Sequence, residues 1–157
     1  MKEYIHYGHK YFDINKFDQI KNETLWVKPC GGLWASAVDS KYGWNKFNED
    51  NRCKECDEQN SFKFTLKENS NVFHIYSVTD LSLLPRVELN KDLYAASKHT
   101  FFIDFENALY SGIDAIELHL SEEKDKHNGI MTGLYYLLYG WDCDSILIMN
   151  PEIVVPI

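Results

Sequence analysis

The chain has 157 residues, of which 45% are hydrophobic and 15% aromatic, and its formal net charge is -8. This length suits one domain with its own core, and the aromatic content excludes a disordered chain. An acidic surface repels phosphate backbones at long range, which disfavours a general nucleic-acid binder.

The sequence gives no sign of export or of membrane insertion. No apolar run approaches the roughly 18 residues that a membrane-spanning helix needs. Lys2 and Glu3 open the chain, and no apolar segment typical of a secretion signal follows them. We therefore expect a cytoplasmic protein without a membrane partner, and its 4 cysteines as reduced thiols.

The first half of the chain predicts short strands separated by polar turns. Asp13 or Asn15 begins a turn or short helix that runs to about residue 21, and the pair Gly31-Gly32 gives the backbone freedom before a strand. Trp44, Phe47 and Asn48 lie at helical spacing. The expected elements are strands at 3–7, 25–27, 33–37, 61–66 and 72–76, a helix at 42–51 and a loop at 52–60.

Residues 61–66 alternate strictly, with apolar side chains at the even positions, which is the period of a half-buried strand. The turn signal at 69–71 follows directly. This pattern predicts that the strands at 61–66 and 72–76 pair as a hairpin.

The second half predicts further short elements. A helical turn begins at Thr79 or Asp80 and ends before Pro85, and Asp104 caps a helix that ends at Gly112. The other expected elements are strands at 115–120, 145–149 and 153–155, a charged loop at 121–129 and a helix at 131–139. Without a regular β-helix-β alternation, the sequence favours one α+β domain over 3–155, with mostly antiparallel sheets and a few short helices.

Three short motifs span almost the whole chain. The first is His6-Tyr7-Gly8 at the end of a strand, and the second is the segment 32–36, Gly-Leu-Trp-Ala-Ser. The third is an acidic segment with Asp142 and Asp144, placed directly before an apolar strand. In this order the motifs resemble those of the ADP-ribosyltransferase fold.

The resemblance implies that NAD is the substrate. His6 would bond a ribose hydroxyl, the backbone of Tyr7 would hold the nicotinamide carboxamide, and Trp34 would stack on the nicotinamide ring. Ser36 would bond a ribose hydroxyl. The NAD-binding residues implied by the resemblance are His6, Tyr7, Gly32, Trp34 and Ser36. Each motif also has a structural interpretation, namely an edge-strand histidine, a core tryptophan and a polar turn.

In the resembling family the third motif carries a glutamate, which stabilises an oxocarbenium-like transition state. This chain offers Asp142, Asp144 and Ser145 as the candidate catalytic residues. If Asp144 takes the position, catalysis proceeds with a side chain that is shorter by one methylene. If Ser145 takes it, transfer is weak or absent and NAD binding alone remains.

The resemblance also bears on partners. The ADP-ribose acceptor would be a macromolecule, and a protein is favoured over nucleic acid. Small transferases of this kind resemble proteins with which phages disable host defence enzymes, including an anti-CRISPR class. A second hypothesis is a non-enzymatic acidic inhibitor that occludes a basic partner surface, which the net charge of -8 suits equally.

The sequence does not predict a metal site. Cys53 and Cys56 have the spacing of a zinc-ligand pair, but a closed site needs four ligands, and the other cysteines are single and distant. We expect free thiols there. Glu117 and His119 point the same way along a strand, which supplies two ligands at most, so we expect a solvated strand face.

Overall fold

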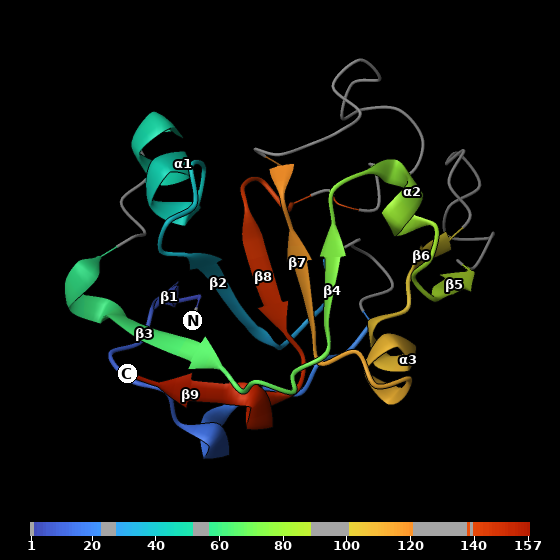
Figure 1. Ribbon diagram of the computed structural model, residues 1–157, viewed down its shortest axis with the longest axis horizontal. Helices are drawn as coiled ribbons and strands as arrows, with labels where there is room; N and C mark the ends of the chain where they lie inside the picture. Colours follow the sequence, from blue (N-terminus) through green and yellow to red (C-terminus); the bar gives the residue numbers. More distant parts are fainter. Residues whose placement is uncertain (1, 23–27, 52–56, 89–100, 121–137, 139) are drawn as a thin grey trace.

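A seven-stranded sheet in the order β4-β7-β8-β2-β1-β3-β9 organises the computed structural model (Figure 1). The structure describes residues 2–22, 28–51, 57–88, 101–120, 138 and 140–157. The strands of this sheet are β1 (Tyr4–Tyr7), β2 (Leu33–Ala37), β3 (Ser61–Leu66), β4 (Val72–Ile75), β7 (Ala115–Leu118), β8 (Ser145–Ile148) and β9 (Val154–Pro156).

The remaining elements are short. Two strands form a separate antiparallel pair, β5 (Arg86–Glu88) and β6 (Phe101–Ile103). The helices are α1 (Trp44–Asn51), α2 (Val78–Leu81), α3 (Phe105–Tyr110) and the single 3-10 turns η1 (Ile14–Lys16), η2 (Glu58–Asn60) and η5 (Pro151–Ile153). The α+β class with few short helices is therefore confirmed. The strand predicted at 25–27, the pair Cys53 and Cys56, and most of the helix predicted at 131–139 lie outside the described residues.

The predicted hairpin between 61–66 and 72–76 is wrong. Strand β3 pairs antiparallel with β1 and β9, whereas β4 pairs in parallel with β7 at the other edge of the sheet. The reason is that alternation fixes which face of a strand is buried, but not which strand lies beside it. Since β4 and β7 run parallel, the sheet is mixed, and it is antiparallel elsewhere among the described strands.

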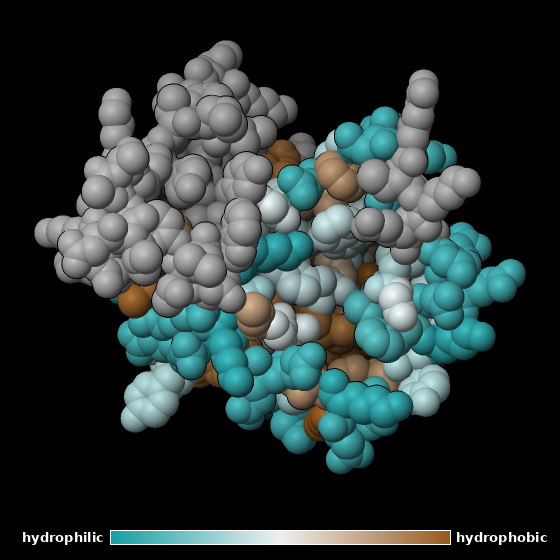
Figure 2. All heavy atoms as spheres, turned by 180° about the vertical axis from the view of Figure 1, so that it is seen from behind, coloured by the Kyte–Doolittle hydropathy of each residue, from teal (hydrophilic) through white to brown (hydrophobic). Residues whose placement is uncertain are grey.

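Both faces of the sheet carry apolar side chains, which form two cores. One core contains residues from β1, β3, β8 and β9, including Tyr4, Phe64 and Ile146, because the twisted sheet folds over itself (Figure 1). The other lies under α2 and α3 and includes Leu81 and Leu147. Seen from behind, hydrophilic side chains surround apolar ones near the centre of the surface (Figure 2).

Local capping explains where the helices begin. The Asp104 side chain accepts a hydrogen bond from the backbone of Asn107, which confirms the predicted cap of α3. Helix α2 is capped by Ser77 and not by Thr79 or Asp80. In the part of the chain that the structure describes, no helix has the length and apolar character needed to cross a membrane.

Candidate functional site

The three predicted motifs lie on neighbouring strands, because β1, β2 and β8 are adjacent in the sheet. Ile5 of β1 lies opposite Ser36 of β2, so these two side chains share one face. His6, the next residue, points to the other face. The structure thus brings the motif backbones together, but the His6 side chain and the side chains of Trp34 and Ser36 lie on opposite faces.

The His6 ring is held in place by a backbone carbonyl of the second motif. Its Nδ1 lies 2.7 Å from the carbonyl oxygen of Trp34, and since a carbonyl only accepts, Nδ1 carries the ring hydrogen. Its Nε2 is then an acceptor, 3.1 Å from Nδ1 of His9. His6 and Gly32 line a pocket of about 380 Å³. Among the other lining residues are Phe12, Phe17, Phe62, Lys10 and Lys16.

The protonation of His6 leads to a first prediction. Burial lowers the pKa of His6 more strongly than the hydrogen bond with Trp34 raises it. The unfolded chain, with an ordinary pKa of about 6.5, therefore binds a proton before the folded protein does, and the free energy of unfolding falls as pH drops through that value. Urea unfolding at pH 5.5 and 7.5 should show a smaller pH effect in His6→Asn than in the unmodified protein. An equal pH effect in both proteins would contradict this assignment.

The Trp34 ring lies among other aromatic rings, and the ammonium group of Lys28 lies over it. The Nζ atom of Lys28 is 4.3 Å from the ring centroid of Trp34 and 5.4 Å from that of Trp44. Burial lowers the pKa of Lys28, although the charge of Asp142 opposes this effect. The ring of Trp141 meets Trp34 edge-on, with centroids 4.7 Å apart. The indole rings of Trp34 and Trp44 thus already bind the partly desolvated ammonium group of Lys28.

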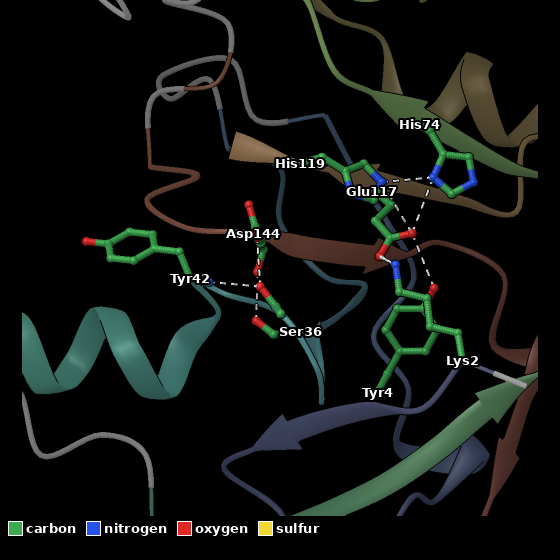
Figure 3. A network of polar contacts seen from close by, with 9 residues as sticks. Lys2, Tyr4, Ser36, Tyr42, His74, Glu117, His119 and Asp144 are labelled. Atoms are coloured by element: carbon green, nitrogen blue, oxygen red, sulfur yellow. Dashed lines mark hydrogen bonds and ion pairs between the residues drawn. The ribbon is translucent and has the colours of Figure 1, made fainter. Parts of the chain in front are cut away.

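Ser36 ties the second motif to the third. Its hydroxyl donates to the carbonyl oxygen of Asp144 at 2.8 Å (Figure 3). It also accepts a hydrogen bond of 3.0 Å from the backbone N–H of Trp44. Ser36 is buried, so these bonds position β2 against the start of β8. Ser36 therefore has a structural role, because it stabilises the corner that residues 142–145 form where the chain enters β8.

The candidate acids differ in their surroundings. Asp144 is buried, and its Oδ2 accepts a hydrogen bond of 2.7 Å from the hydroxyl of Ser40. Ser145 is also buried, and its hydroxyl donates to the carbonyl oxygen of Cys143 at 3.1 Å. Asp142 is exposed to solvent. Of these three residues, Asp144 alone brings a carboxylate into the buried corner.

No protein-family model matches the chain, and no curated protein or solved structure matches it either.

A second cluster joins the predicted pair Glu117 and His119 to His74, which the sequence did not indicate. His74 of β4 lies opposite Glu117 of β7 in the parallel register, and His119 follows two residues later on the same side. Glu117 is only 3% exposed, so the expected solvated strand face is wrong. The wrong hairpin partner for β4 concealed His74, because only parallel pairing with β7 places it beside Glu117.

Glu117 is held by several polar partners (Figure 3). Its Oε1 accepts a hydrogen bond of 2.6 Å from Nζ of Lys2, and its Oε2 accepts one of 3.2 Å from the hydroxyl of Tyr4. Burial alone raises the pKa of Glu117, but the hydrogen bond from His74 and the ion pair with Lys2 outweigh burial and lower it. Burial lowers the pKa of His119 despite the opposing charge of Glu117.

Proposed function

We propose that the protein binds NAD and transfers its ADP-ribose to a protein acceptor. The observation that carries this proposal is the cation held on the rings of Trp34 and Trp44. The nicotinamide ring of NAD is flat and aromatic, and it is positively charged while it is bonded to ribose. Trp34 therefore offers it both stacking and cation–π attraction.

In this proposal nicotinamide takes the place that the Lys28 ammonium occupies. The neighbouring Trp141 supports such a ligand, since its buried indole Nε1 has no hydrogen-bond partner among the described residues. A buried donor without an acceptor costs about 1–3 kcal/mol. The carboxamide oxygen of nicotinamide is an acceptor of the kind that this donor lacks.

Asp144 supplies the negative charge that the reaction needs. The bond between ribose C1′ and the nicotinamide nitrogen breaks, its electron pair leaves with nicotinamide, and positive charge develops on the ribose. A nucleophilic side chain of the acceptor then forms a bond to C1′ and releases its proton to solvent. Asp144 directly precedes β8, and its carbonyl is bonded to Ser36, whose side chain shares a face with Trp34. Alternation places the Asp144 side chain on the face of Ile146, opposite Trp34. In this proposal the ribose therefore passes around the end of the sheet to reach the carboxylate, which stabilises the developing charge.

Binding of NAD by variants tests the ring site. Trp34→Ala removes stacking and cation–π attraction, together about 1–2.5 kcal/mol, so we expect calorimetry to show NAD affinity weakened roughly 5–70-fold. His6→Ala removes a side chain that lies on the opposite face of the sheet from Trp34, so it should leave the NAD affinity nearly unchanged. Lys28→Ala removes a competing cation and should not weaken it at all.

A matched control is Tyr110→Ala, since Tyr110 is an aromatic residue that is 92% exposed on α3. It should bind NAD as the unmodified protein does. Nicotinamide released from NAD in the presence of cell extract reports the transfer reaction. No NAD binding at millimolar concentration, together with no modified protein in the extract, would refute the proposal and favour the non-enzymatic inhibitor.

A further inference from the structure

We propose that His74, Glu117 and His119 form a binding site for a divalent transition metal ion, with zinc as the foremost candidate. Each residue contributes one ligand atom, and these three atoms lie within 4.8 Å of one another. Two imidazole nitrogens and one carboxylate oxygen are a ligand set that zinc accepts in proteins. The site is separate from the ring site of Trp34, and the proposal does not depend on NAD binding.

The distances between the ligand atoms suit one ion. Nδ1 of His74 is 3.0 Å from Nε2 of His119 and 3.3 Å from Oε2 of Glu117, and the third distance, from Nε2 of His119 to Oε2 of Glu117, is 3.6 Å. Zinc binds nitrogen and oxygen at about 2.0–2.2 Å, which makes the edge of its coordination tetrahedron about 3.3 Å. The three atoms therefore have the size of one face of that tetrahedron.

Hydrogen bonds among the three side chains explain this geometry less completely. An ionised carboxylate only accepts, and each neutral imidazole has one nitrogen that donates and one that accepts. One hydrogen on His74 Nδ1 serves either His119 or Glu117 well, but not both. A metal ion binds the lone pairs of all three atoms at once, which accounts for their convergence on one point.

The neighbours of the cluster hold its ligands in place. Tyr76 stacks on the His119 ring, with centroids 4.1 Å apart and planes 9° apart. The Tyr4 hydroxyl orients Glu117. Outer-shell contacts of this kind fix the direction of metal ligands. The His74 side chain is 44% exposed, so an ion can enter from solvent. Three protein ligands leave a fourth position for water or another small ligand.

Lys2 opposes the ion. Its ammonium group is 2.6 Å from Oε1 of Glu117 and brings a positive charge beside the site. Loss of this charge would weaken a network of ion pairs around Glu117, whereas it would strengthen the binding of a metal ion. Lys2→Met should strengthen zinc binding several-fold if the site binds metal, because one repulsive charge is removed.

The experiment uses the full chain without an affinity tag, freed of metal by a chelator and titrated with zinc in a calorimeter. We expect one equivalent to bind. His74→Ala and His119→Ala should each weaken binding by more than the roughly 10–100-fold that loss of an outer-shell contact costs. His9→Ala is the matched control, since His9 is an exposed histidine that contacts His6, and it should leave the affinity unchanged.

The cysteine pair needs its own control. Cys53→Ser/Cys56→Ser should still bind one equivalent of zinc, and cobalt bound to the unmodified protein should lack the thiolate charge-transfer absorption of a cysteine site. Circular dichroism verifies that each variant is folded. Three outcomes would overturn the proposal. These are no binding, binding unchanged in both His74→Ala and His119→Ala, and binding that disappears in the cysteine variant.

Discussion

Replacing Asp144 with asparagine is expected to lower the rate of nicotinamide release by ~10²–10³-fold and to leave the affinity for NAD nearly unchanged. In the proposed reaction the carboxylate stabilises charge that develops only in the transition state, so its loss should affect the rate far more than binding. Asparagine has the same shape and can still accept the hydrogen bond from Ser40 through its Oδ1 atom. Single-turnover measurements of nicotinamide, with a separate NAD titration, distinguish the two effects.

Two neighbouring variants serve as controls for this prediction. Asp142→Asn changes the same functional group at an exposed position and should release nicotinamide at the unmodified rate. Ser145→Ala removes a hydroxyl that bonds the carbonyl of Cys143, and should change turnover only slightly. Full activity in Asp144→Asn with loss in Ser145→Ala would transfer the catalytic position to Ser145. Full activity in all three variants would make this corner a structural turn.

The strands were predictable where a single pattern determines them. The predicted strand at 33–37 has the same bounds as β2, and 61–66 the same as β3, because alternation and flanking turn residues are local properties. β5 was missed, since its three residues are too few to show a period. The partners of β3 and β4 were not predictable, because pairing depends on contacts between residues far apart in the chain.

The same distinction applies to the candidate sites. Trp34 and Asp144 were candidates because of the resemblance of their motifs. Lys28 was not a candidate, because no sequence pattern shows which way the chain turns at Gly31 and Gly32 before Trp34. Glu117 and His119 were predictable as a pair on one face of a strand. The third member, His74, comes from a parallel neighbour 43 positions earlier in the chain, and no local pattern joins them.

The largest loss of stability is expected from Gly31→Ala. Gly31 has a φ of +74°, a conformation that costs other residues about 1–2 kcal/mol. A Cβ atom there would overlap the carbonyl oxygen of Gln19 and lie 2.9 Å from that of Asp18. These backbone atoms cannot easily retreat, because the Asp18 carbonyl accepts a hydrogen bond from Gly32 at 2.9 Å. Overpacking adds about 1–3 kcal/mol, so we expect a total of about 2–5 kcal/mol in urea unfolding.

Gly112→Ala separates the two parts of this cost. Gly112 also has a positive φ, +89°, but a Cβ atom there would meet nothing within 4 Å. The free energy of unfolding of Gly112→Ala should fall only by the conformational cost of the positive φ, about 1–2 kcal/mol. The difference between the two variants in the loss of unfolding free energy measures how firmly residues 18–19 are held against the start of β2. Asp18 and Gly32 both line the pocket at His6, so this contact also shapes that pocket. Equal losses in both variants would show that the segment yields, and that the glycine at 31 is needed for its φ alone.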